Sequence, residues 1–431
     1  MLLRLVFGFA LSLCLSWPAG AHAFQVATDQ GNGDELRWDT SNVVEYRLHQ
    51  DFGGGLVPLR MQGAVRKSFE TWSSLPDSDI DVQEGGIFRG AACPHAIPAA
   101  MVPQVDAICG EPVPDVDGES VVFFIETLWP FDTAVIGLTT LTWAEGGELV
   151  DADIALNGID YDWTMDAGAP VTDFETILVH EIGHFFGLSH TSEPGAVMRV
   201  DYQQGDRVLS LGQDDIDGLA YLYPCSGGDC SSRVGFEEAS CSMAGGAGSL
   251  AALAGLLLLA GLLRGRRAAA LPLLALLLLP SVADTSVVVE LTALDLADRS
   301  DAVVRGTVTG SSSRMDRVVW TDVTLRVDEV LQGDSPAELL ITQPGGIAGG
   351  YGTKVFGMPD FALGEEAVLF LDFTDFGPRV VGLAQGKATV GADGGLERDL
   401  SGLSLARAAE AGPVRAATLP PVLDGLRTLL K

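Results

Sequence analysis

Basic residues are scarce in this chain. Its 431 residues include 26 Lys and Arg against 58 Asp and Glu, so the formal net charge at pH 7 is -32. A chain this acidic repels nucleic acids and anionic lipid surfaces. The composition therefore predicts that no nucleic acid is a partner.

Cysteine is also scarce, with six in the whole chain. Cys14 lies in the apolar N-terminal run, which leaves five for the rest. Cys93 and Cys109 could close one loop, and Cys225 and Cys230 could close another. Cys241 is then left without a partner. The count is compatible with two disulfides only if the protein is exported.

The first 23 residues predict that export. They contain an early Arg4, an apolar run from Leu5 to Trp17, and the small-residue sequence Ala21-His22-Ala23. These are the regions of a secretory signal peptide that is removed after Ala23. A membrane anchor is the competing interpretation, but the run is short and ends in helix-breaking residues. We therefore expect an exported protein, extracellular or at the cell surface or outer envelope.

Histidine is rare too, yet three of the six histidines fall between His180 and His190, where the sequence reads HEIGHFFGLSH. On a helix, His180 and His184 project from one face, so both imidazoles can reach one ion. Glu181 can accept a proton from water without being a ligand. Gly187 is expected to end the helix in a left-handed conformation, after which His190 supplies a third nitrogen. The pattern predicts a catalytic zinc site with its fourth position open to water.

This stretch, followed by Met198, resembles the metzincin zinc endopeptidases, in which a methionine-containing turn passes under the metal. Residues 211–223, LGQDDIDGLAYLY, resemble the C-terminal helix of the matrixin branch. The resemblance covers residues 36–224 and implies an α+β fold with a twisted, mostly parallel five-stranded sheet, two long helices and a small C-terminal subdomain. It implies that protein or peptide substrates are hydrolysed, with these roles: His180, His184 and His190 as zinc ligands, Glu181 as base and Met198 in the turn.

Hydrophobic patterns place this site among predicted elements. Strands are expected at 43–48, 121–125, 136–143 and 149–157, and a helix at 58–74. Thr172 and Glu175 have the spacing of a capping box, so the helix that carries His180 should begin near Asp173. The segment after Met198 should form part of the pocket for the side chain just beyond the scissile bond.

One predicted strand is a candidate for substrate binding. The threonine-rich sequence of residues 136–143 suits an edge strand, and in matrixins the corresponding edge strand pairs with an extended peptide. We carry that role to Gly137 to Thr142. On the next strand, Asp151 and Asp153 alternate with apolar residues, so they either help to hold Ca2+ or form a solvated strand face.

The composition changes after Tyr223. A Gly- and Ser-containing linker (225–243) precedes residues 244–263, which carry no charge and are long enough to span a bilayer as a helix, and Arg264 to Arg267 follow. Cys241, the apolar segment and the arginines resemble the C-terminal sorting tails of myxobacterial surface proteins. A second apolar segment, 268–283, either returns through the membrane as a helical hairpin or belongs to a second signal peptide, which would mean two adjacent secreted proteins read as one chain.

Residues 284–400 are rich in alternating strand patterns separated by Gly and Asp turns, and they contain no histidine or cysteine. They predict a small all-β domain, a barrel or a sandwich, with a binding or spacer role. Residues 401–431 are rich in Ala and Leu and predict a helical tail.

The resulting prediction is a secreted or surface-anchored zinc metalloendopeptidase. Its parts are a signal peptide (1–23), a matrixin-like peptidase domain (24–224), the linker, the membrane segment or hairpin, the β-rich domain and the tail. The alternative from another class is a catalytically inactive zinc-binding adhesion or scaffold protein. A third possibility is that the β-rich domain supplies the main function and the peptidase only processes it.

Overall fold

The computed structural model describes most of the chain between Phe24 and Lys431. The described residues are 24–50, 53–89, 118–126, 129–169, 171–199, 201–203, 206–225, 286–316, 318–374, 377–400, 402–407 and 419–431.

Five strands from the N-terminal half lie side by side in the order β3, β2, β4, β6, β5. Neighbours run parallel, except that β5 is antiparallel to β6. Four of these strands, β2, β4, β5 and β6, agree with the strands expected at 43–48, 121–125, 136–143 and 149–157, whereas β3 was not predicted. The bounds of the five strands are Val44–His49 (β2), Val82–Phe88 (β3), Ser120–Ile125 (β4), Val135–Ala144 (β5) and Leu149–Asn157 (β6).

Two helices pack together over this sheet. α1 (Pro58–Ser73) buries the apolar face that its sequence predicts, including Phe69 and Trp72. α3 (Phe174–Phe185) is buried along nearly its whole length. The rings of Phe69 and Phe185 meet edge to face at 5.1 Å, and Trp72 Nε1 donates a hydrogen bond of 2.9 Å to the Val179 carbonyl oxygen. These contacts hold α3 in one orientation relative to the sheet.

One helix and two small sheets complete this part of the molecule. α4 (Gln213–Leu222) follows the loops after α3. Two small two-stranded sheets pair β1 (Gln25–Val26) with β9 (Leu188–Ser189), and β7 (Trp163–Thr164) with β8 (Thr172–Asp173).

The C-terminal part is built on a seven-stranded antiparallel sheet of β14, β13, β12, β17, β19 and β20, with β18 also paired to β17. Successive residues of β12 and β17 alternate between two buried clusters, so both faces of the sheet are covered, one of them by α6 (Ala293–Asp298) and α7 (Leu423–Leu429). The strand bounds are Ala302–Asp316 (β12), Val318–Gly333 (β13), Glu338–Pro344 (β14), Glu366–Thr374 (β17), Gly377–Val380 (β18), Lys387–Val390 (β19) and Leu396–Glu397 (β20).

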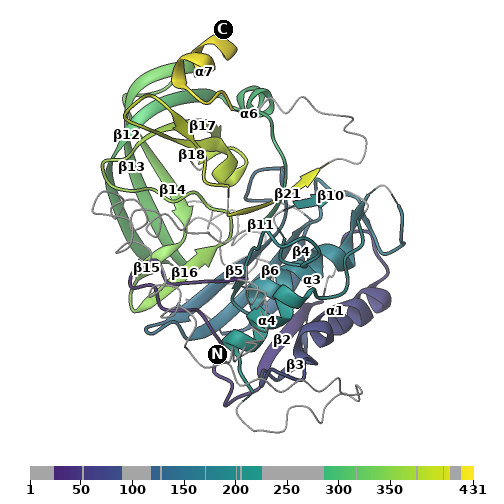
Figure 1. Ribbon diagram of the computed structural model, residues 1–431. Coiled ribbons are helices and arrows are strands. Elements are labelled where there is room, and N and C mark those ends of the chain that lie inside the picture. The colour runs from purple at the N-terminus through teal and green to yellow at the C-terminus, as the bar shows by residue number, and fades with distance from the viewer. Residues whose placement is uncertain are drawn as a thin grey trace, which may run out of the picture.

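The first sheet is larger than the five strands expected, because strands from the C-terminal part join it. β11 (Ser286–Val289) and β16 (Tyr351–Val355) both pair with β5, β15 (Gly346–Ala348) pairs with β16, and β21 (Leu403–Arg407) links β11 to β10 (Asp201–Gln203). The result is a ten-stranded sheet. Figure 1 shows β11 and β21 where the two parts meet. The unpaired N–H and C=O groups of an edge strand favour such pairing.

The predicted fold class was wrong in its membrane-spanning helix or hairpin, because no helix among the described residues is both long enough and apolar enough to cross a bilayer. Strands of the β-rich part are also continuous with the first sheet. The tail expected to be helical contains β21 as well as α7. The segments predicted for the membrane-spanning helix or hairpin, 244–263 and 268–283, lie outside the described residues, as do the signal peptide and the two proposed cysteine loops in whole or in part.

Candidate metal centre

α3 begins at a cap that differs from the one predicted. Asp173, not Thr172, is the N-cap residue, and its carboxylate accepts a hydrogen bond of 2.9 Å from the Thr176 amide. Glu175 pairs with Arg207 instead of reaching back to the cap, and Arg207 also bonds Asp173 at 2.8 Å. The predicted capping box was therefore wrong: the helix starts one residue later than a Thr172 cap requires, and Thr172 itself pairs with Trp163 of β7.

The turn after α3 brings the third histidine back to the helix. Gly187 has a φ of 84°, a conformation that strains residues with a Cβ. A Cβ at this position would also collide with the backbone oxygen of Leu36. The chain then forms β9 against β1 and places His190 beside α3. This is the return that the sequence predicted from Gly187.

The three histidine side chains converge within the protein interior. His184 Nε2 lies 3.2 Å from His180 Nε2, and His190 Nε2 lies 2.5 Å from His180 Nε2. His184 and His190 are fully buried, and His180 is 5% exposed. One ligand atom from each residue lies within 4.8 Å of the others. The trio could hold a metal ion, and in the described part of the chain no other group of three or more His, Cys, Asp or Glu could do so.

The hydrogen bonds of two rings orient their nitrogens for a metal. His180 Nδ1 lies 2.8 Å from the Val197 carbonyl oxygen, and His184 Nδ1 lies 2.8 Å from the Leu188 carbonyl oxygen. Since a carbonyl only accepts, each Nδ1 carries the proton and each Nε2 keeps its lone pair for the centre. Burial lowers the pKa of His180 to about 4 and holds the pKa values of His184 and His190 well below 6.5. Neutral imidazoles are the form that binds zinc, so the donor set fits that ion.

Glu181 lies beside the converging rings and is fully buried. Its Oε2 accepts a hydrogen bond of 2.7 Å from Thr139 Oγ1 of β5, while its Oε1 has no hydrogen-bonding partner in the protein. Burial raises the pKa of this carboxyl to about 8, against the lowering effect of the hydrogen bond from Thr139. An unpartnered buried oxygen needs a further donor, which a water molecule or a cation at the centre would provide.

Met198 lies under α3 and is buried, as the sequence predicted for the turn residue. Its loop is held by Asp215, a residue whose role the sequence did not reveal. The Asp215 carboxylate accepts hydrogen bonds from the backbone amides of Val197 (2.7 Å), Met198 (3.1 Å) and Gly212 (2.8 Å). Its place in the first turn of α4 is a common capping position, which was the available signal.

The C-terminal part covers the open side of the centre. The ring of Phe356, directly after β16, stacks on the His184 ring with centroids 4.1 Å apart. A cavity of about 20 Å³ beside His180 and Val197 is closed by Val287 and Ser404. No local motif predicts these contacts, because they join residues more than a hundred positions apart.

The predicted calcium residues are not a solvated strand face. Asp151 and Asp153 are both buried on β6, and Asp153 accepts a hydrogen bond of 2.9 Å from the Val121 amide. This bond gives Asp153 a structural role in joining β6 to β4.

Comparisons with known proteins agree with this geometry. Residues 129–224 match the family model described as Matrixin. Metalloendoproteinase 5-MMP of Arabidopsis thaliana is 42% identical over 73 residues, which is 15% of this chain and 20% of that protein. Human matrilysin is 42% identical over 65 residues, which is 15% of this chain and 24% of that protein.

A longer match has lower identity. Metalloendoproteinase 4-MMP of Arabidopsis thaliana is 29% identical over 170 residues, 39% of this chain and 41% of that protein. The matches thus span less than half the length of these relatives. The segment that contains the three histidines is similar to matrixin metalloproteases.

Proposed function

We propose that this chain is a zinc metalloendopeptidase that hydrolyses peptide bonds of proteins. The observation that carries the proposal is the convergence of three buried, neutral imidazoles next to a buried carboxylate with an unpartnered oxygen. In this proposal His180, His184 and His190 hold the ion through Nε2, and Glu181 is the general base. The similarity of residues 129–224 to matrixins supports the same assignment.

The proposed reaction uses few groups. When bound, zinc supplies Lewis-acid chemistry: it polarises the substrate carbonyl and favours attack by water near neutral pH. Glu181 accepts the proton of the attacking water at Oε1 and returns it to the leaving amine nitrogen. Thr139 holds the other carboxylate oxygen, so Oε1 stays directed to the centre. Met198 and the loop fixed by Asp215 support the rings from below.

The proposed substrate is an extended peptide. Residues 137–142 of β5 would pair with its backbone, a mode of recognition that does not depend on particular side chains. The cavity beside His180 and Val197 would take the side chain after the scissile bond. Its present volume of about 20 Å³ holds no more than about one water molecule, so the cavity must widen for a substrate.

We also propose that the protein is exported, on the strength of the pattern in residues 1–23. The boundaries of the segments 24–224 and 284–400, and the role of Cys241 as the processing or anchoring cysteine of a sorting tail, are proposals on the same footing. Intact-mass analysis of the natural protein tests them, because it shows whether the chain begins after Ala23 and whether it ends near Cys241, near Arg267 or at Lys431. A mass that includes residues 1–23 contradicts removal of a signal peptide.

A calcium ion bound near Asp151 and Asp153 is a separate proposal. Both carboxylates are buried on β6, and carboxylate oxygens are among the ligands that Ca2+ takes. Calcium usually takes six to eight oxygen ligands, so Asp151 and Asp153 alone are too few. A thermal melt with and without Ca2+ tests this point; an unchanged melting temperature removes calcium from the account.

The experiment for the main proposal compares the parent chain with Glu181→Gln. Both should retain one zinc per chain, because Glu181 is not a ligand. In a casein zymogram the parent should clear the gel and lose this activity with a chelator, while Glu181→Gln should clear at most about 1% as much. Equal clearing by the two proteins contradicts the role of Glu181. Zinc binding without any clearing by either is expected of an inactive zinc-binding adhesion or scaffold protein, and also of a peptidase whose centre stays covered by Phe356; a variant with the centre uncovered separates the two.

A further inference from the structure

Two strands of the C-terminal part already occupy the outer edge of β5. β11 pairs with it antiparallel at Val135 and Gly137. β16 pairs with it antiparallel from Thr140 to Ala144. Between them they pair with most of the 137–142 segment, whose other edge is bonded to β6. Each backbone group bonded to β11 or β16 is withdrawn from pairing with a peptide.

The two strands meet in front of the metal centre. The Phe356 amide donates a hydrogen bond of 3.4 Å to the Thr139 carbonyl oxygen, between the two paired segments. Ser286 Oγ donates to the Phe356 carbonyl oxygen, so the start of β11 is bonded to the residue after β16. The Phe356 ring stacks on His184. The strands therefore cover the position above Glu181 as well as the edge of β5.

The C-terminal part also contacts the opposite side of the metal centre, next to the segment that follows Met198. β21 pairs in parallel with β10, directly after the Met198 loop, and Ser404 Oγ donates a hydrogen bond of 3.2 Å to the Arg199 carbonyl oxygen. On its other side, β21 pairs in parallel with β11. The C-terminal part thus forms a continuous bridge from β5 to the segment after Met198, as Figure 1 shows.

These contacts are part of a packed interior. Val287 is 1% exposed and Phe356 is 0% exposed. Both belong, with Ala406, to the same hydrophobic cluster as Trp72 and Phe174 of the peptidase part. Apolar side chains buried to this degree are in persistent contact, so the covered centre is a stable state of the chain.

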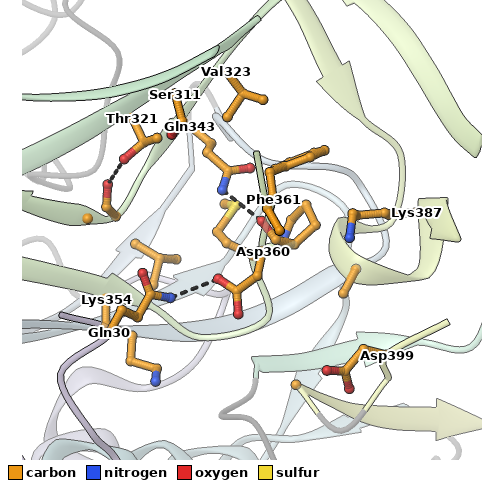
Figure 2. A pocket seen from close by; sticks show the side chains of 18 of the residues that line it. Gln30, Ser311, Thr321, Val323, Gln343, Lys354, Asp360, Phe361, Lys387 and Asp399 are labelled. Carbon is orange, nitrogen blue, oxygen red and sulfur yellow. Dashed lines mark hydrogen bonds between the residues drawn. The ribbon is translucent and has the colours of Figure 1, made fainter. Parts of the chain in front are cut away.

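Packing is less dense on the far side of β16. There the two parts form a cavity of about 870 Å³, lined by Gln30 near the N-terminus, by Lys354 of β16 and by Asp360 among others. Gln30 Nε2 donates a hydrogen bond of 2.8 Å to Asp360 Oδ1 across it (Figure 2). Movement of β16 away from β5 could therefore use this space, but it also requires Val355 to leave a buried cluster that contains Phe123 and Leu138.

From this arrangement we propose that β11, β16 and Phe356 form an internal inhibitor, which occupies the place of a peptide substrate and must leave β5 before cleavage. The inference rests on the proposed peptidase function, because the same edge and centre are its substrate site. The occupant is a segment of this chain itself, in antiparallel backbone pairing with β5. A peptide substrate would then compete with β11 and β16 for one strand edge.

The test introduces buried charges that disfavour the closed form, in which β11, β16 and Phe356 cover the edge of β5 and the metal centre. Val287→Asp with Phe356→Asp puts two carboxylates into the buried cluster beside the metal centre, which strongly disfavours the closed state. Leu340→Asp with Leu363→Asp is the matched control, since these side chains are 56% and 73% exposed and add the same charges elsewhere. All chains are loaded with zinc. The probes are a tripeptide hydroxamate, which combines a metal-binding group with a strand-forming backbone, and an internally quenched peptide.

The opened variant should bind the hydroxamate at least about tenfold more tightly than the parent and the control, and it should cleave the quenched peptide at least about tenfold faster. Equal hydroxamate binding by the parent and the opened variant overturns the inhibitor. Tighter hydroxamate binding without any cleavage supports the inhibitor and contradicts the peptidase function. Rapid cleavage by the parent, equal to that of the opened variant, supports the function and overturns the inhibitor.

A second measurement needs neither zinc nor a variant that opens. Hydrogen exchange of the β5 amides in the parent should be slow and should occur through release of β11 and β16. A disulfide between Ala144→Cys and Tyr351→Cys, which are paired positions, should slow this exchange further, and reduction should restore the parent rate. The parent treated with the same reductant is the control. Rapid exchange in the parent, or no change on cross-linking, overturns the proposal.

Discussion

Gly183 of α3 lies directly against the sulfur atom of Met198. A Cβ at this position would overlap Met198 Sδ and would also come within 2.9 Å of the Trp72 ring. The absence of a side chain at Gly183 therefore allows the Met198 loop to pass close beneath the helix that carries His180 and His184.

Gly183→Ala should destabilise the protein by about 1–3 kcal/mol, because neither Met198 nor Trp72 has space to move away. The displaced loop should also weaken metal binding through the Val197 carbonyl that orients His180. Thermal denaturation and zinc titration measure the two effects. Gly63→Ala in α1 is the control: nothing lies within 4 Å of its added Cβ, so it should stabilise the helix by about 0.5–1 kcal/mol. Equal stability of the two variants would contradict the close approach.

His190→Ala should remove zinc from the purified chain to well below one equivalent, because two imidazoles and water hold the ion far less tightly than three imidazoles. Metal analysis after dialysis measures this loss. His49→Ala is the matched control, as His49 is a buried histidine on β2 with no part in the cluster. A His190→Ala chain that keeps a full equivalent of zinc would show that the ligands are misassigned.

Asp215→Ala should destabilise the protein by about 2–4 kcal/mol, because three backbone amides of the Met198 loop and the start of α4 lose their acceptor. Urea denaturation measures the change in the free energy of unfolding. Asp217→Ala, one half-turn further along the same helix, removes a carboxylate that accepts from the exposed Gln213 side chain, and its effect should stay within about 0.5 kcal/mol. If Asp215→Ala loses no more free energy of unfolding than Asp217→Ala, the role of Asp215 in holding the loop is contradicted.

Lys354 of β16 should make the stability of the folded protein depend on pH. Burial lowers its pKa to about 8, while Asp360 and Asp29 partly oppose the shift. A folded-state pKa below the unfolded value means that the folded chain binds this proton more weakly, so the destabilisation is complete below about pH 8 and disappears between about pH 8 and pH 10.5. Lys354→Met should therefore raise the free energy of unfolding by up to about 3 kcal/mol at pH 7.

The measurement for Lys354→Met is the difference from the parent at each pH, which cancels the titration of other groups. That difference should shrink toward zero by about pH 10.5. Lys387→Met is the control with the opposite sign, because Lys387 pairs with Glu365 at 2.6 Å and its loss should destabilise. If Lys354→Met raises the free energy of unfolding by the same amount from pH 7 to pH 10, burial does not shift the pKa of Lys354.

Much of the metal centre follows from sequence spacing alone. A helix places residues four apart on one face, so His180 and His184 had to lie together once α3 formed. Gly187 indicated the turn that returns His190. The strands next to the site were also predictable, because short runs rich in apolar and β-branched residues favour strands; β5 and β6 are buried on both faces.

Other features needed contacts that no local pattern encodes. The cap of α3 lies at Asp173, whose carboxylate accepts from the Thr176 amide, one residue after the predicted cap. The position of Asp215 beneath Met198 depends on how α4 packs after an intervening loop. The sequence indicated a helix start near Asp173 but did not single out Asp215, and it could not say which backbone amides either carboxylate would meet.

The histidine triad, the neighbouring Glu181 and the turn that returns His190 were thus determined by short-range sequence, because helix geometry and a left-handed glycine act over a few residues. Only the tertiary structure decided that the edge of β5 is taken by β11 and β16 and that Phe356 covers His184. Strand pairing uses backbone N–H and C=O groups that every residue but proline carries. Partners more than a hundred residues apart therefore leave no mark on one another's sequence, and only the folded chain shows which edge they share.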